Sequence, residues 1–290
     1  EKVELDPVHR IRITLSAVRA APHDAEARAA LASLIDDRSL REPLAAVLAD
    51  EARAAERADV AATLYEHLAD LHEEMDQPLD AIAAMEALIS KLPGTAELCD
   101  RLAWMYRKAG AWAKAAAMFV EVGELSPDEH GRAALRAAGA LYREHKQLDR
   151  AAQVFRAIVA RRPGDQQAWR QLDDVLSELG QWREVAAVRG SRAERARGVE
   201  RATLLRSQAR ALEQAGELEA AAVAVAEAAI HAPDDLSGLI DHADVLVRGG
   251  RHGEAATLLE KRLADAIERA APVDQISALR LRIVGALDDA

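Results

Sequence analysis

Apolar side chains recur three or four residues apart along most of the chain, the spacing that places them on one side of an α-helix. Between residues 59 and 271 this pattern returns at regular distances, and one bulky position serves as the reference of each block. That position is held by His72, Tyr106, Tyr142, Leu176, Leu212 and Leu246. The intervals are 34, 36, 34, 36 and 34 residues, so the pattern predicts an array of repeated units.

The first part of each unit predicts a helix with one packed stripe. A large residue lies seven positions before the reference and a small one three positions before it, which lets a neighbouring helix approach closely. The large residues are Tyr65, Cys99, Leu135, Trp169, Leu205 and Leu239. The small residues are Ala69, Ala103, Gly139, Ala209 and Ala243, with Asp173 as the exception.

The second part of each unit predicts a turn and another helix. Four residues after the reference stands a glycine, where a helix must stop, at Gly110, Gly180, Gly216 and Gly250. A small residue inside the second helix follows at Ala81, Ala115, Ala151, Ala221 and Ala255, with Val185 as the exception. A bulky residue follows at Met85, Phe119, Phe155, Val225 and Leu259, with Arg189 out of pattern. The closing prolines, which cannot continue a helix, are Pro93, Pro127, Pro163 and Pro233.

This register resembles the tetratricopeptide repeat, whose pattern has tryptophan, leucine, glycine, tyrosine, alanine, phenylalanine and proline at fixed places. The resemblance covers residues 59–271. It implies an all-α fold, an α-solenoid in which antiparallel helix pairs stack into a right-handed superhelix. Residues 1–58 are interpreted as partial and degenerate helical repeats, and residues 272–290 as the first helix of a further, truncated repeat. Both ends look cut, so we expect a fragment of a larger protein, bacterial by its richness in Ala and Arg.

One unit departs from the pattern. Residues 166–199 lack the closing proline and carry Asp173, Val185 and Arg189 at packing positions. Two explanations are open, a shifted second helix or a local break in the stack. Extra residues at 128–131 and 197–200 are expected to lengthen two connections between units.

Composition narrows the class of protein. Half of the 290 residues are apolar but only 3% are aromatic, and the formal net charge is −11. Such a charge disfavours non-specific binding to nucleic acid or to anionic membranes. No apolar run is long enough to span a bilayer. A single cysteine, Cys99, leaves no partner for an intramolecular disulfide. We expect a cytoplasmic location, with the periplasm as an alternative.

No catalytic, nucleotide or cofactor motif is found, so the chain is predicted to be non-enzymatic and to need no cofactor. His67 and His72, among acidic neighbours, form the one cluster that resembles a metal site. Their spacing of five does not place two ligands on one face of a helix, so ordinary packing is favoured. Cys99 lies at a core position, which favours a structural thiol.

The resemblance implies that a stripe beside the core of each first helix lines a concave groove that holds extended peptides. In this stripe Arg136, Arg170 and Arg206 take the same place in three successive units, and Trp104 stands at the edge of the row. Arginine binds carboxylates in a bidentate manner, and tryptophan is a rigid apolar anchor. The candidate peptide-binding residues are Trp104, Arg107, Arg136, Arg143, Arg170, Arg206 and Arg210. The alternative, which we favour, is that each arginine pairs with an acidic residue of the next unit.

From these features we predict a scaffold that binds a partner protein or peptide, with an acidic segment as one candidate ligand. A lysine and asparagine clamp for a chaperone tail is excluded, because the chain contains no asparagine. Two other functions stay open. One is a regulatory or substrate-recruiting arm of a larger enzyme, and the other is a periplasmic assembly or secretion scaffold. Self-association through the end helices is a further possibility.

Overall fold

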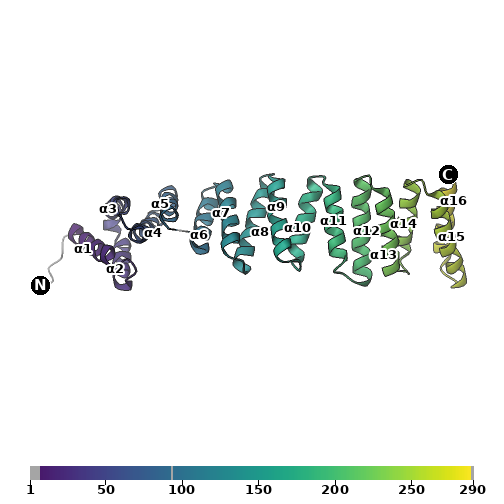
Figure 1. Ribbon diagram of the computed structural model, residues 1–290, viewed down its shortest axis with the longest axis horizontal. Helices are drawn as coiled ribbons and strands as arrows, with labels where there is room; N and C mark the ends of the chain where they lie inside the picture. Colours follow the sequence, from purple (N-terminus) through teal and green to yellow (C-terminus); the bar gives the residue numbers. More distant parts are fainter. Residues whose placement is uncertain (1–6, 93, 289–290) are drawn as a thin grey trace. The chain divides into compact units, whose positions relative to one another are not determined.

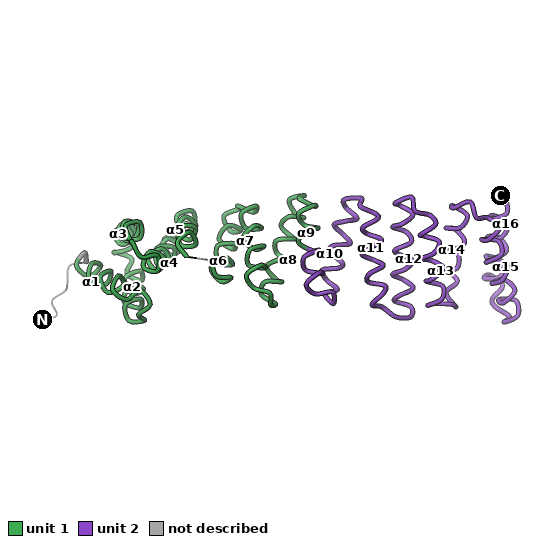
Figure 2. The backbone as a smooth tube through the Cα atoms, viewed as in Figure 1, with its two compact units in different colours: residues 1–154 green, residues 155–290 purple. Residues whose placement is uncertain are grey.

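The computed structural model describes residues 7–92 and 94–288. These residues contain sixteen α-helices, one short 3-10 helix and no strand, so the all-α fold predicted from the sequence is confirmed (Figure 1). The chain forms two compact units, residues 1–154 and 155–290, and the boundary between them falls within a helix (Figure 2). This boundary differs from the division by repeat content, which remains a prediction.

Unit 1 begins with helices that do not follow the repeated arrangement, and it continues as regular helical hairpins. The irregular part consists of α1 (Pro7–Ala20), α2 (Ala25–Asp36), the 3-10 helix η1 (Arg38–Leu40) and α3 (Arg41–Ala54). The regular part consists of α4 (Ala58–Glu74), α5 (Pro78–Lys91), α6 (Ala96–Lys108), α7 (Trp112–Leu125), α8 (Glu129–Glu144) and the first half of α9 (Leu148–Arg161). Each of the helices α1 to α7 packs against the next one along the chain.

Unit 2 repeats the same arrangement. After the second half of α9 it consists of α10 (Gln166–Glu178), α11 (Trp182–Ala193), α12 (Gly198–Gln214), α13 (Leu218–His231), α14 (Leu236–Arg248), α15 (His252–Glu268) and α16 (Val273–Asp288). Here too each of α10 to α15 packs against its successor. Each unit is therefore a segment of an α-solenoid, in which short turns join helices that lie side by side.

The core occupies the positions that the periodicity predicts. The small position of the second helix is fully buried in all six hairpins, including the exception Val185. Ala103 and Gly139, at the small position of the first helix, are buried as well. The small residue of the first helix and the bulky residue of the second are always sixteen residues apart, so each hairpin contributes one such pair.

The turn within each hairpin has one conformation. The residue four positions after the reference has a positive φ in every case, at Asp76, Gly110, Lys146, Gly180, Gly216 and Gly250. In the α6–α7 turn, the Gly110 N–H donates to the Arg107 carbonyl at 3.1 Å and the Ala111 N–H donates to the Tyr106 carbonyl at 2.9 Å. These two bonds form a Schellman motif, and they recur in the other five turns. Glycine suits this place because it adopts a left-handed conformation without steric cost.

Two expectations about irregular places are corrected. Helix α11 begins six residues after its reference, as every other second helix does, and it packs against both α10 and α12. The second helix of this hairpin is therefore neither shifted nor separated from the stack by a break. The extra residues near 129–131 and 198–200 do not lengthen connections, because they form the first turns of α8 and α12.

The closing prolines agree with the helix ends that are described. Pro127, Pro163 and Pro233 each follow the last residue of a second helix by two positions. Pro93, the fourth of them, lies outside the described residues. A proline disfavours helical geometry in the residue before it, which explains why these helices stop where they do.

Candidate functional site

The first helices of successive hairpins share a face beside the core, most of whose residues are exposed or partly exposed. We call it the first-helix face, and it comprises the positions nine, six and two residues before the reference and the one directly after it. In unit 1 it runs over α4, α6 and α8, and in unit 2 over α10, α12 and α14. All seven residues proposed to bind a peptide lie on it, Trp104, Arg107, Arg136 and Arg143 in unit 1 and Arg170, Arg206 and Arg210 in unit 2.

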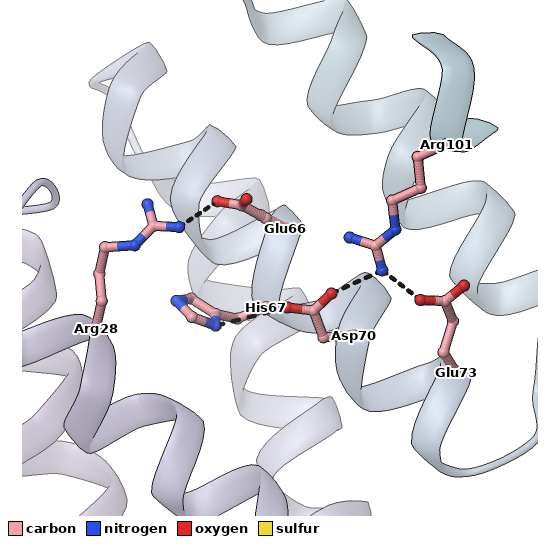
Figure 3. A network of polar contacts seen from close by, with 6 residues as sticks. All are labelled: Arg28, Glu66, His67, Asp70, Glu73 and Arg101. Carbon is pink, nitrogen blue, oxygen red and sulfur yellow. Dashed lines mark hydrogen bonds and ion pairs between the residues drawn. The ribbon is translucent and has the colours of Figure 1, made fainter. Parts of the chain in front are cut away.

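At the start of unit 1, ion pairs neutralise the acidic residues of this face. Arg28 of α2 donates to Glu66 of α4 at 2.7 Å (Figure 3). From the other side, Arg101 of α6 reaches between two acidic residues of α4 and donates to Asp70 at 2.7 Å and also to Glu73. These pairs connect α4 to α2 on one side and to α6 on the other, and they leave little free negative charge on α4.

His67 and His72 have structural surroundings. The imidazole of His67 is buried, with Nδ1 4.0 Å from an Asp70 oxygen. Burial lowers the pKa of His67, Arg28 lowers it further, and Asp70 and Glu66 oppose the shift. His72 Nδ1 forms a 2.7 Å hydrogen bond with Gln77. Among the described residues, no three histidine, cysteine or acidic side chains gather as metal ligands would.

Trp104 and Arg107 form a preassembled pair on α6. Trp104 is 50% exposed, and its ring meets the buried ring of Phe119 edge to face at 5.4 Å. The Arg107 guanidinium carbon lies 4.9 Å from the centroid of the Trp104 ring, in cation–π geometry. Arg107 is exposed, and the described residues provide it with no carboxylate partner. The pair thus combines an apolar surface with a cation that is held in place.

Helix α8 continues the face in unit 1. Arg136 donates to Glu129 of the same helix at 3.1 Å. His130 of α8 lies 3.7 Å from Asp100 of α6. Arg143 occupies the same register as Arg107, in the next first helix along the chain.

In unit 2 the predicted arginines have unequal surroundings. Arg206 of α12 contacts Asp235, the N-cap residue of the next first helix, α14, at 2.9 Å, and it lies 4.0 Å from Asp241 within α14. Arg210 shares Asp241 at 3.3 Å. Arg170 of α10 is exposed and has no ion pair with any described residue. Arg206 and Arg210 therefore pair with acidic residues of the next hairpin, and Arg170 remains open to a ligand.

Two of the three exceptions in the α10–α11 hairpin, Asp173 and Arg189, bind each other, which sequence reasoning missed. Arg189 Nε donates to both carboxylate oxygens of Asp173, at 3.0 and 3.2 Å, and its Nη1 donates to the Ser207 carbonyl at 2.8 Å. Arg192 lies 3.9 Å from Asp173. Asp173 and Arg189 are sixteen residues apart, at the small and bulky positions of one hairpin. That spacing was the signal that could have revealed the pair.

Other candidate features add little chemistry. Cys99 is fully buried, and burial raises the pKa of its thiol, which disfavours a nucleophilic role. Helix α16 exposes Leu281, Val284 and Leu287, and self-association through an end helix would use this surface. None of the described helices combines the length and the low charge that a bilayer crossing needs.

Comparison with known proteins bears on the fold. No protein-family model matches the chain, and no curated protein matches it. Its structure is similar, over 97% of its length, to a chain in the complex of Naa15 and Naa10 bound to HypK-THB, with 14% identity and a TM-score of 0.52. The present chain covers 39% of that chain. A likeness of this kind shows the fold alone.

The hairpin register, the six left-handed turns and the packing of consecutive helices decide the type of repeat. The fold is of the tetratricopeptide type. Two solved tetratricopeptide proteins are also similar to the chain. One, from Parabacteroides merdae, shares 16% identity over 83% of this chain and 93% of its own, with a TM-score of 0.31. The other, YrrB, is described as having an unusual peptide-binding site and shares 16% identity over 67% of this chain and 97% of its own, with a TM-score of 0.35.

Proposed function

We propose that the chain is a non-enzymatic scaffold that binds a partner protein through an extended peptide segment laid along the first-helix face. The observation that carries this proposal is the Trp104–Arg107 pair, an exposed aromatic ring with a cation fixed beside it. Exposed Trp and Arg are the residue types that contribute most to protein interfaces. The complex of Naa15, Naa10 and HypK-THB gives modest support, since a chain of similar fold lies within a protein assembly there.

The ligand segment is proposed to be acidic. Arg107 and Arg170 are exposed, and neither forms an ion pair with a described residue, so both are available to carboxylates. Arg136 and Arg143 extend the proposed contact surface of unit 1, and Arg206 and Arg210 extend that of unit 2. All four have interactions within the protein that a ligand would share or replace. No observation on the described residues favours an enzyme arm or a periplasmic scaffold over the general binding role.

Selection from a library of short random peptides displayed on phage tests this function. Wild-type protein is expected to enrich acidic peptides that also contain apolar residues, and Trp104→Ala/Arg107→Ala is expected to lose them. The matched control is Leu79→Ala/Lys108→Ala, which removes an exposed apolar residue of α5 and an exposed cation of α6 off the first-helix face. If wild-type protein enriches no peptide, or the control loses binding as the test variant does, the proposed function is wrong.

A further inference from the structure

The register of the first-helix face makes Trp104 exceptional. The position two residues before the reference carries Asp70, Trp104, Ala140, Asp174, Arg210 and Asp244 in the six first helices. A single aromatic ring therefore stands among short or charged side chains. Its edge-to-face contact with Phe119 anchors it to the core of its own hairpin, while half of its surface stays exposed. Leaving this much indole surface in water is unfavourable, and a ligand that covers it would gain the corresponding hydrophobic free energy.

The Arg107 guanidinium is held where a carboxylate could reach it. Its position over the Trp104 ring restricts its rotamers before any ligand arrives, so less conformational entropy is lost on binding. Neighbouring charges on this face are already engaged. Asp100 lies near His130, and Asp70 is bound by Arg101. Within the described residues, no carboxylate competes for Arg107.

The two groups also fix a spacing. Arg107 covers one face of the Trp104 ring, so an apolar ligand side chain would stack on the other face. The guanidinium carbon is 4.9 Å from the ring centroid. A stacked ligand group adds roughly 3.5–4 Å on the opposite side. In an extended peptide, side chains two residues apart point the same way and are separated by about 7 Å. This separation is somewhat shorter than the sum of the two distances above, and the length of a glutamate side chain makes up the difference.

We infer that the Trp104–Arg107 pair recognises an extended peptide with an apolar side chain followed, two residues later, by an acidic one. The apolar side chain stacks on Trp104 and the carboxylate binds Arg107 in a bidentate manner. This inference rests on the proposed function and adds to it the ligand pattern and the two residues that read it. Because both residues belong to α6, recognition of the pattern needs unit 1 alone.

Short peptides with one Phe and one Glu in a Gly/Ser background test this inference. Acetylated and amidated versions place Glu one, two, three or four positions after Phe, and fluorescence anisotropy with a terminal dye gives Kd for each. We expect the version with a separation of two to bind best. Replacing its Glu with Gln is expected to weaken binding by about tenfold, the loss typical of a charge-assisted bidentate contact.

A double-mutant cycle identifies the protein partner of each peptide group. In Arg107→Gln the difference between the Glu and Gln peptides should disappear, while the contribution of Phe is retained. In Trp104→Ala the contribution of Phe should disappear. Lys108→Ala, which changes a neighbouring exposed cation of the same helix, should keep both.

Three results would overturn the inference. They are equal affinity at every separation, a Glu-to-Gln difference that persists in Arg107→Gln, and no binding of the Phe-x-Glu peptide at millimolar concentration. Its failure is distinguishable from that of the proposed function. If displayed peptides are still enriched in the selection described above, the chain binds peptides by another pattern. If none is enriched, both proposals fall.

Discussion

The α6–α7 and α10–α11 hairpins have the same backbone plan and opposite chemistry at the point where their two helices meet. In α6–α7 the small and bulky positions hold Ala103 and Phe119, both buried. In α10–α11 the same positions hold Asp173 and Arg189, which form a partly buried ion pair. Both second helices begin six residues after the reference, so the exchange leaves the register unchanged.

The difference shows that the residues at the small and bulky positions of a hairpin must match each other. Apolar packing satisfies this requirement in one hairpin, and an ion pair satisfies it in the other. Phe119 is buried, with its ring against that of Trp104, and its burial removes apolar surface from water. Asp173 and Arg189 satisfy each other, and the Ser207 carbonyl accepts a further hydrogen bond from Arg189. Such pairs gain little net stability, because removing the charges from water offsets their attraction. The apolar hairpin should therefore depend on one large side chain, and the charged hairpin on keeping both partners.

The largest effect is expected in the apolar hairpin. Phe119→Ala removes a ring that is 1% exposed and leaves a cavity, so the free energy of unfolding should fall by about 3–5 kcal/mol. Urea denaturation monitored by circular dichroism measures the change. Trp104→Ala is the control, because its ring is half exposed and should matter less. A loss below about 1 kcal/mol for Phe119→Ala would show that the ring of Phe119 is not central to the packing of this hairpin.

A smaller loss is expected when the charged pair is broken from one side. Asp173→Ala leaves Arg189 and Arg192 partly buried without their carboxylate, which should cost about 2–3 kcal/mol of unfolding free energy. The same urea titration measures it. Gln167→Ala, at an exposed position of the same helix, should stay within about 0.5 kcal/mol of wild type. Equal effects of the two variants would contradict the role given to the pair.

Replacing the charged joint with the apolar one should restore stability. Asp173→Ala/Arg189→Phe recreates the Ala103 and Phe119 combination and should be about 1–2 kcal/mol more stable than wild type, since apolar replacement of a buried ion pair is often favourable. The two single variants complete a double-mutant cycle. A double variant as unstable as Asp173→Ala would show that the α10–α11 hairpin cannot accommodate the apolar pair.

A third way to bury a polar group is to keep it uncharged, as the α4–α5 hairpin does with His67. Burial lowers the pKa of His67, so the folded protein favours the neutral imidazole. Its contribution to stability is present above the unfolded pKa of about 6.5 and is lost as the pH falls through the lower folded pKa. Urea titrations from pH 7 to pH 5 should therefore show falling stability, with a shallower fall in His67→Gln. An identical pH dependence in both proteins would contradict this assignment.

The smallest effect concerns the turn. Lys146 has a φ of 58° at a position where four of the six hairpins have glycine, so Lys146→Gly should raise the free energy of unfolding by about 0.5–1 kcal/mol. Gly110→Ala is the matched reverse change. A methyl group there meets no atom within 4 Å, so any loss comes from the backbone conformation alone. If both variants change stability in the same direction, conformational strain is not the cause.

Most of the fold follows from the sequence, because helical periodicity, turn glycines and prolines each act locally. The start of α11 and the burial of Val185 agree with the pattern even where the residue types do not. The mutual binding of Asp173 and Arg189 was missed, since it depends on where two helices meet. The partners of Arg136 and Arg206 also needed coordinates, because an exposed arginine has several carboxylates within reach.

The burial of Cys99 has a practical consequence. The single thiol of the chain is inaccessible, and its raised pKa keeps it protonated near neutral pH, so maleimide reagents should react with it slowly. A second cysteine introduced on an exposed side chain, such as Lys108→Cys, would consequently be labelled selectively in the otherwise native protein. An environment-sensitive dye attached there would turn α6 into an optical reporter for peptides that dock beside it.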